Sequence, residues 1–353
     1  MIYDKETNCI IIESIFKFAL NGAVELRISE LNKLKDAFEK NREHLWRNKI
    51  LTTLAYILEN NDIITDRTRY LVNKWKVYME ESRKISEWFS KNGIEAIIVK
   101  TIRSVPCDVS DIDLLINKDS NISIARHVLK KLGYVLRRGG LGQELWSKIV
   151  SGYTVNVELH NKLAAADYEY YPREELFGKK YRILNNIKIP DLLDELLINV
   201  SHAVMKDLEI KFIELLEFLV VLNKYNIQNE DIINKSRKLG LLIPLFTLAL
   251  ATYNLFNQYS RTVEPLLISL KKALRLNFHI IRILLNDKPK SILDLPISVN
   301  PLIILCSYFN SFTKKIVLEG FTKTFREALS IPCGPGIDTI LYRWIPIKKP
   351  HME

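Results

Sequence analysis

The stretch SDIDLLI at residues 110–116 alternates polar and apolar side chains as a β-strand requires. Side chains on a strand point to opposite faces in turn, so Asp111 and Asp113 share one face while Ile112 and Leu114 share the other. Two carboxylates at this spacing repel each other, and aspartate is depleted in strands. A hard divalent cation such as Mg²⁺ would offset the repulsion. An edge strand with two solvated aspartates is the alternative.

A second acidic strand is expected at residues 154–160, TVNVELH. Its apolar residues Val155 and Val157 face the core, and Glu158 and His160 face the other side. If the two acidic strands are neighbours, Glu158 becomes a third carboxylate beside the aspartates. Three converging carboxylates are typical of sites that hold two divalent ions for phosphoryl transfer. Taken alone, Glu158 fits an ordinary half-exposed strand equally well, and His160 fits a hydrogen-bonding partner beside it.

The residues around these two strands predict a small α/β unit. A β-branched run at 94–100 predicts a buried strand, and Asp119 is placed to cap a helix over 122–132. A strand over 134–138 then leads into a glycine-rich turn at 138–142. The Ser151–Gly152 pair predicts a hairpin that joins strands over 144–150 and 154–160.

The rest of the chain has helical periodicity. Glycine and proline number only 12 each among 353 residues, which favours long helices over many hairpins. Helices are expected across 10–60 and over 67–92, the latter capped by Asp66. After Pro190, apolar periodicity predicts helices over 191–205, 210–225, 229–239, 241–257, 262–284, 298–313 and 315–330.

The predicted fold is therefore α+β, with a small mixed β-sheet module flanked by N-terminal helices and a C-terminal all-helical domain. The expected divisions are an N-terminal helical segment (1–66), the α/β module (67–190), and a C-terminal helical domain with a basic tail (191–353). Basic residues at 314–326 and 343–349 form one face of that last part. Such a face is usually solvated, and an acceptor-binding surface is the alternative.

Composition narrows the class of protein. Hydrophobic residues make up 48% and charged residues 26%, which excludes a disordered or collagen-like chain. No CxxC pair is present, so a zinc site is not expected. The N-terminus lacks a signal-peptide pattern and the longest apolar stretch, 240–256, is interrupted by Pro244, so we expect a cytoplasmic protein without a membrane span. A net charge of +10 suits a phosphate-bearing partner, and a solvated helical surface explains it equally well.

Several of these segments together resemble a known family. Lys100 ends one strand, the Asp-Ile-Asp-Leu-Leu-Ile strand follows, and a helix ends in Leu-Gly-Tyr at 132–134. A Val-Glu-Leu-His strand at 157–160 and a His-Ala pair at 202–203 before an apolar helix complete the order. Over about residues 65–225 the chain resembles the uncharacterised nucleotidyltransferase family of the DNA polymerase β-like nucleotidyltransferase superfamily.

The resemblance implies a set of functional residues and ligands. Asp111, Asp113 and Glu158 would be the catalytic metal ligands for Mg²⁺ or Mn²⁺, and Glu158 would help to deprotonate the attacking hydroxyl. A nucleoside triphosphate such as ATP would be the substrate. The residues assigned to its binding are Lys100, Thr101, Arg103, Ser110 and His160.

The chain departs from the family pattern in three places. Thr101 stands where the family has glycine, and Glu158 stands where it has aspartate. The stretch 102–109, with Pro106 inside it, is too short for a helix whose N-terminus would hold a triphosphate.

Two functions follow from these observations. The first is metal-dependent transfer of a nucleoside monophosphate from a nucleoside triphosphate to a hydroxyl of RNA or another acceptor. The second is a catalytically degenerate module of the same fold that binds nucleotide, RNA or a partner protein without turnover.

Three other candidates receive structural interpretations. Cys107 lacks a thiolate-stabilising neighbour in sequence, so we interpret it as a small buried residue. His202 is interpreted as structural because it lies on an apolar helix. The tyrosines at 168, 170 and 171 could stack on bases, but acidic neighbours would repel a phosphate backbone, so a surface turn is favoured.

Overall fold

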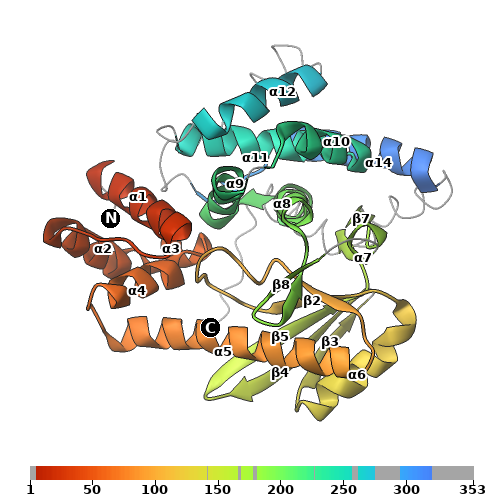
Figure 1. Cartoon of the computed structure of the whole chain (residues 1–353), viewed down its shortest axis with the longest axis horizontal. Helices are drawn as coiled ribbons and strands as arrows, with labels where there is room; N and C mark the ends of the chain where they lie inside the picture. Colours follow the sequence, from red (N-terminus) through yellow and green to blue (C-terminus); the bar gives the residue numbers. More distant parts are fainter. Residues whose placement is uncertain are drawn as a thin grey trace, which may run out of the picture.

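The computed structural model describes residues 5–140, 142–165, 168–177, 181–225, 227–256, 261–274 and 295–319. In Figure 1, helices from the N-terminal part lie to the left of a small β-sheet, and helices from the C-terminal part lie above it. This arrangement confirms the predicted α+β architecture. Within the described residues, no helix combines the length and the apolar character that crossing a bilayer requires.

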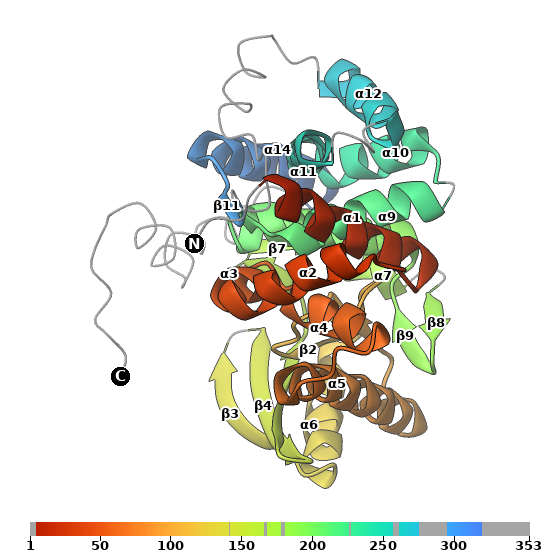
Figure 2. The same cartoon turned by 90° about the vertical axis from the view of Figure 1, so that its left-hand side faces the viewer.

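Among the described residues, five helices precede the sheet; the short α3 is one that the sequence analysis does not predict. Their bounds are α1 Lys5–Asn21, α2 Ile28–Lys40, α3 Arg42–Arg47, α4 Leu51–Asn60 and α5 Asp66–Lys91. The apolar sides of α1, α2 and α4 enter the main hydrophobic core through residues such as Ile15, Phe38 and Leu54. Figure 2 shows α1 to α4 stacked above the long helix α5.

The prediction that Asp66 caps α5 is wrong by one residue. Thr65 has the extended backbone of an N-cap, and its hydroxyl oxygen accepts a hydrogen bond from the Thr68 amide at 3.1 Å. Asp66 is the first helical residue, where its negative charge suits the positive end of the helix dipole. At the other end, Gly93 has φ +70°, a left-handed conformation that commonly ends a helix.

The sheet has five strands in the order β1-β2-β5-β4-β3. Strands β2 and β5 pair in parallel, and all other neighbours pair antiparallel, so the sheet is mixed. The bounds are β1 Ala96–Val99, β2 Ile112–Ile116, β3 Val135–Gly140, β4 Gln143–Val150 and β5 Tyr153–His160. The two strands that carry the acidic residues are therefore neighbours in the middle of the sheet.

The two faces of the sheet pack against different layers. Helices α5 and α6 (Ile122–Lys131) cover one face, where they contact core residues such as Leu114 and Val157. On the opposite face, Val99 and Leu115 join the core of the C-terminal helices. Because side chains alternate along a strand, this second face also carries the acidic residues.

The chain beyond β5 forms short hairpins and then the C-terminal helices. The hairpin elements are β6 Leu163–Ala165, β7 Tyr168–Tyr171, α7 Glu174–Phe177, β8 Arg182–Leu184 and β9 Ile187–Ile189. The later elements are α8 Leu192–Ser201, a π-helical turn His202–Lys206, β10 Glu209–Ile210, α9 Phe212–Lys224, α10 Asn229–Leu239, α11 Leu242–Leu255, α12 Glu264–Leu274, β11 Ile297–Ser298 and α14 Pro301–Glu319.

Several local predictions need correction. Asp119 does not cap α6, because Asn121 occupies the N-cap position; the Asp119 carboxylate instead accepts a hydrogen bond from Arg173 at 2.7 Å. The glycines expected in a turn at 138–142 lie partly in strand β3, where Gly139 and Gly140 pair with β4. The tyrosines at 168, 170 and 171 are buried in β7 rather than exposed in a turn.

Two helix predictions near the C-terminus have a different outcome. Two separate helices are expected over 298–313 and 315–330. In the described residues a single helix, α14, instead runs without a break from Pro301 to Glu319. The end of the helix expected over 262–284 and the basic segments beyond residue 319 lie outside the described residues.

Candidate functional site

The parallel pairing of β2 and β5 sets Asp113 directly beside Glu158. Both side chains lie on the sheet face away from α5, because they alternate with residues such as Ile112 and Val157 that pack beneath that helix. Asp111 precedes β2 by one residue, although the sequence predicts it within the strand. The structure therefore sets two of the three carboxylates that the sequence pattern suggests side by side, and the third, Asp111, lines the same pocket.

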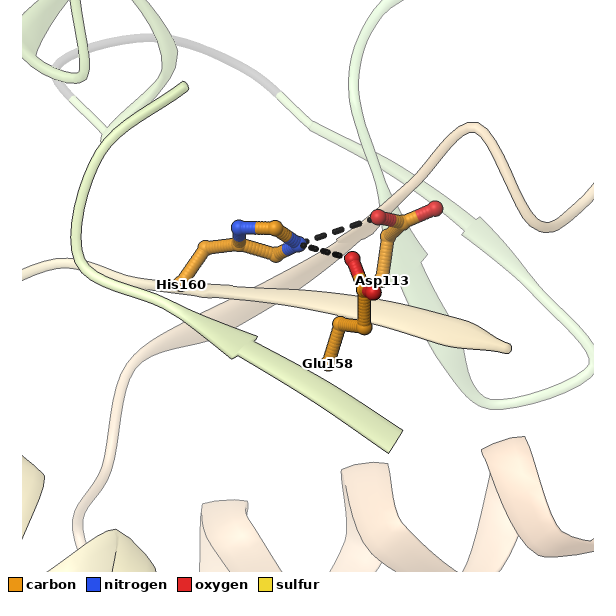
Figure 3. A group of neighbouring side chains, drawn as sticks. All are labelled: Asp113, Glu158 and His160. Carbon is orange, nitrogen blue, oxygen red and sulfur yellow. Dashed lines mark hydrogen bonds and ion pairs between the residues drawn. The ribbon is translucent and has the colours of Figure 1, made fainter. Parts of the chain in front are cut away.

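His160 completes a compact group with two of these acids. Its Nε2 atom lies 3.0 Å from Oδ1 of Asp113 and 3.4 Å from Oε2 of Glu158, and Figure 3 shows the three side chains pointing toward one another. One potential ligand atom from each residue lies within 4.8 Å of the other two. Asp113 and His160 are buried, and Glu158 is half-buried.

Lys100 and Thr101 hold Asp113 from the end of β1. The Lys100 ammonium lies 2.8 Å from Oδ1 of Asp113, and the Thr101 hydroxyl accepts a hydrogen bond from the Asp113 amide at 2.9 Å. Burial alone would raise the pKa of the Asp113 carboxyl. The positive charge of Lys100 and the hydrogen bond from His160 outweigh burial and hold that pKa well below its usual range.

Asp111 has the opposite electrostatic environment. Burial, followed by repulsion from Asp113 and Glu158, raises the pKa of the Asp111 carboxyl to about 6. Its Oδ2 atom accepts a hydrogen bond from the Ser110 hydroxyl at 3.0 Å. The Ser110 carbonyl in turn accepts a hydrogen bond from Tyr78 at 2.9 Å, which ties this turn to α5. The negative charge of Asp111 is therefore held in place but is incompletely compensated.

These residues border a pocket of about 330 Å³. Its walls come from the ends of β1, β2 and β5, the loop 101–111, the turn between α3 and α4, and the segment from His202 to α9. The residues given a metal or nucleotide role from the sequence that line it are Lys100, Thr101, Arg103, Ser110, Asp111, Asp113 and Glu158. His160 lies behind this lining, where it contacts the acids.

Arg103 and Thr101 have surroundings different from those expected of phosphate ligands. Burial would lower the pKa of Arg103, but the negative charges of Glu217 and Glu214 in α9 raise it. The Thr101 hydroxyl lies 3.2 Å from the Val99 carbonyl and 2.9 Å from the Asp113 amide, and therefore braces the end of β1.

Cys107 is buried, as its structural interpretation requires, whereas His202 lies at the pocket. Cys107 is buried, and burial raises the pKa of its thiol to about 12, as expected of a small inert core residue. His202 lines the pocket, and burial holds its pKa well below its ordinary value. Its Nδ1 atom lies 3.6 Å from Oδ1 of Asp207.

The pocket also contains residues that sequence analysis missed. Lys49 comes from the turn between α3 and α4, and Lys206, Asp207 and Lys211 come from the segment between α8 and α9. Lys206 and Lys211 follow the His-Ala pair at 202–203 within nine residues, so this motif could have indicated that both lysines lie near the site. No local pattern marks Lys49, because it reaches the pocket only through the packing of the N-terminal helices.

Three comparisons with known proteins indicate to which family this chain and its pocket belong. The family model of an uncharacterised nucleotidyltransferase matches residues 62–257, more than half of the chain. The chain belongs to the uncharacterised nucleotidyltransferase family. No curated protein and no solved structure matches it. The match runs from the start of α5 to just beyond α11, and it leaves α1 to α4 outside the nucleotidyltransferase region.

The donor set suits the divalent ion that nucleotidyltransferases generally use. Carboxylate oxygens are the ligands that Mg²⁺ prefers, and Mn²⁺ accepts the same oxygens together with an imidazole nitrogen. Asp111, Asp113 and Glu158 offer the oxygens, and His160 offers the nitrogen. Burial raises the pKa of Asp111 most, repulsion from Asp113 and Glu158 raises it further, and a bound cation would relieve that repulsion. The residues present therefore fit a divalent ion.

Proposed function

We propose that this chain is a metal-dependent nucleotidyltransferase that moves a nucleoside monophosphate from a nucleoside triphosphate to a hydroxyl acceptor. The observation that carries the proposal is the convergence of Asp111, Asp113 and Glu158 on one wall of a pocket whose other walls carry lysines. Carboxylates hold a divalent cation, and cations attract phosphates. Membership of the nucleotidyltransferase family supports the same reaction class.

Each residue has a role in this proposal. Asp111, Asp113 and Glu158 would hold Mg²⁺ or Mn²⁺. The bound ion would neutralise charge that develops on the phosphate oxygens. Lys100 and His160 keep Asp113 ionised and oriented through their contacts with its carboxylate. Ser110 lines the pocket and suits a contact with the triphosphate, whereas Arg103 lines it beside the charges of Glu217 and Glu214.

The transfer balances as a single displacement. The acceptor's hydroxyl oxygen forms a bond to the α-phosphorus while the bond between that phosphorus and the bridging oxygen of pyrophosphate breaks. Pyrophosphate leaves with the electron pair of the broken bond. The proton of the hydroxyl passes to Glu158, whose half-buried carboxylate borders the pocket.

In this proposal the acceptor carries the attacking hydroxyl and binds to a positively charged protein. The net charge of +10 suits RNA or another phosphate-rich acceptor. One observation favours the alternative of a binding module without turnover. The loop 101–111 forms no helix, so it lacks the helix N-terminus that binds phosphates in many nucleotide sites.

An acceptor screen distinguishes the two functions. Purified protein is incubated with Mg²⁺ and each α-labelled nucleoside triphosphate, with total RNA or total protein from the source cell as acceptor. The double variant Asp111→Asn/Asp113→Asn runs beside the wild type, and Asp36→Asn on the surface of α2 is the matched control. We expect label in one acceptor pool, retained by the control and lost in the double variant.

Binding measurements cover the case in which the acceptor is missing from both pools. Thermal melting is recorded with Mg²⁺ alone, with each nucleotide alone and with both. A metal-dependent enzyme is stabilised most by both together, whereas a binding module is stabilised by nucleotide alone. If no pool is labelled and no combination raises the melting temperature, the proposal of catalysis is wrong.

A further inference from the structure

The N-terminal helices lie outside the family match, yet they reach the pocket. Residues 62–257 match the family model, and α1 to α4 precede that region. Lys49, in the turn between α3 and α4, nevertheless lines the pocket with the carboxylates. This segment therefore adds a side chain to the site that the family region does not contain.

Contacts on both sides hold this turn in place. Asn48 is fully buried, its side-chain oxygen accepts a hydrogen bond from the Phe212 amide at 3.1 Å, and its side-chain amide donates to the Leu295 carbonyl at 3.1 Å. The Lys49 carbonyl accepts a hydrogen bond from the Asp108 amide at 3.4 Å. The turn is thus clamped between the start of α9 and the loop that leads into β2.

The backbone of Lys49 is also unusual. Its φ of +58° lies in the left-handed region that favours glycine and that side-chain-bearing residues rarely adopt. A non-glycine residue persists in such a conformation only where the surrounding structure determines it. A lysine at this position places a positive charge at the pocket, although its backbone conformation is strained for a residue with a side chain.

The other lysines of the pocket either form ion pairs with aspartates or have a lowered pKa. Lys100 lies 2.8 Å from Asp113, and Lys211 lies 2.6 Å from Asp207. Burial and the charge of Lys100 lower the pKa of Lys206. Lys49 is half-buried and makes no ion pair with any residue that the structure describes. Its ammonium is therefore available to an anionic ligand.

The position of Lys49 indicates which part of a nucleotide it meets. The Lys49 carbonyl accepts a hydrogen bond from the amide of Asp108, which stands three residues before Asp111. The charge of Lys49 acts on Asp111 and Cys107 of this loop, and also on Asp207 across the pocket. Lys49 therefore lies beside the loop that leads to Asp111. An α-phosphate at the acids would direct its terminal phosphates toward one side of the pocket.

We propose that Lys49 binds the terminal phosphates of the nucleoside triphosphate, so that the N-terminal helical segment completes the nucleotide site. This inference rests on the proposed function. An ammonium on a held turn forms charge-assisted hydrogen bonds to phosphate oxygens. It would stabilise the bound triphosphate and the leaving pyrophosphate, and it would contribute little to a monophosphate that lacks those groups.

Calorimetric titration with three Mg²⁺-loaded probes tests the inference. The probes are each nucleoside triphosphate, the matching nucleoside monophosphate, and inorganic pyrophosphate. The main variant is Lys49→Gly, which removes the ammonium while relieving the left-handed backbone, so we expect it to melt at or above the wild-type temperature. Lys49→Arg restores a cation, and Lys35→Met removes an exposed charge from α2 in the same segment.

We expect Lys49→Gly to weaken triphosphate and pyrophosphate binding by about tenfold or more while changing monophosphate binding less than about twofold. Lys49→Arg recovers most of the affinity, and Lys35→Met binds like the wild type. If Lys49→Gly binds triphosphate as the wild type does, this inference is wrong and the proposed function remains. If the wild type binds none of the probes, both are wrong. A general loss of affinity for all three probes would also contradict a role at the terminal phosphates.

Discussion

At the scale of single residues, the two aspartates of the Asp-Ile-Asp sequence have opposite electrostatic roles. Asp113 is buried with Lys100 and His160 on its carboxylate, and its pKa is well below the usual range. Asp111 lacks such partners, and its pKa is raised to about 6. The sequence presents them as equivalent because residues two apart on a strand share a face. Their neighbours across the sheet make them different.

This contrast predicts opposite effects on the stability of the metal-free protein. Asp111→Asn removes a disfavoured charge, so we expect the free energy of unfolding to rise by about 1–2 kcal/mol. Asp113→Asn leaves Lys100 and His160 without their carboxylate, so we expect a fall of about 2–4 kcal/mol. Urea unfolding in the presence of a chelator measures both. Shifts of the same sign in the two variants would contradict this account of the site.

The raised pKa of Asp111 also predicts a pH dependence. The carboxyl has a pKa of 3.8 when unperturbed and about 6 in the folded protein, so the folded state holds the proton more tightly. The contribution of Asp111 to stability is therefore greatest below about pH 4 and is lost as the pH rises through about 6.

The difference in unfolding free energy between wild type and Asp111→Asn isolates this contribution from other groups. We expect the variant to gain on the wild type between pH 4 and pH 7 in chelator, and saturating Mg²⁺ to reduce the gain at pH 7. A difference that stays constant over this range would show that Asp111 is not subject to the repulsion described.

At the scale of elements, the start of α5 shows that the local sequence predicts a helix end to within one residue. The periodicity of the sequence predicts α5 well, and its N-cap is displaced by one residue from Asp66 to Thr65. Both side chains are good caps, so composition alone does not choose between them. The choice falls on Thr65 because its backbone is extended and its hydroxyl reaches Thr68.

Replacing each candidate cap measures this difference. We expect Thr65→Ala to lower the free energy of unfolding by about 1 kcal/mol, because the Thr68 amide loses its partner. Asp66→Ala removes only a favourable charge in the first turn, for which about 0.3–1 kcal/mol is typical. Thermal or urea unfolding of the two variants provides the comparison. A larger loss for Asp66→Ala would support the cap that the sequence suggests.

At the scale of the whole molecule, parts that are distant in the sequence share one core. Ile15 of α1, Val99 of β1 and Leu216 of α9 belong to a single cluster of buried residues. We retain the division into 1–66, 67–190 and 191–353 as a proposal about sequence units. Because the core crosses these boundaries, we expect the units to unfold together, which coincident fluorescence and circular dichroism transitions would test.

Asn48 provides a direct test of this long-range packing. Its side chain joins the α3–α4 turn to the α9 amide of Phe212 and to the Leu295 carbonyl. We expect Asn48→Ala to lower the free energy of unfolding by about 2–3 kcal/mol, because it leaves buried polar groups unpaired. Asn32→Ala on the exposed side of α2 is the control, with an expected change within about 0.5 kcal/mol. Equal, small effects would mean that this contact is dispensable.

The sequence by itself determined the features that depend on local periodicity. The alternation at 110–116 and 154–160 identified both acidic strands, and the order of motifs identified the family. The helices of the N- and C-terminal parts followed from apolar spacing. These features are readable because side-chain direction repeats within a few residues.

Only the tertiary structure decided which of these residues meet. The parallel pairing of β2 with β5 brings Asp113 to Glu158. Contacts of the α3–α4 turn with Phe212, Leu295 and Asp108 hold Lys49 at the same pocket. The burial of the three tyrosines of β7 was likewise decided by the helices that cover them. Contacts between residues far apart in sequence depend on how complete elements pack, and no local pattern encodes that packing.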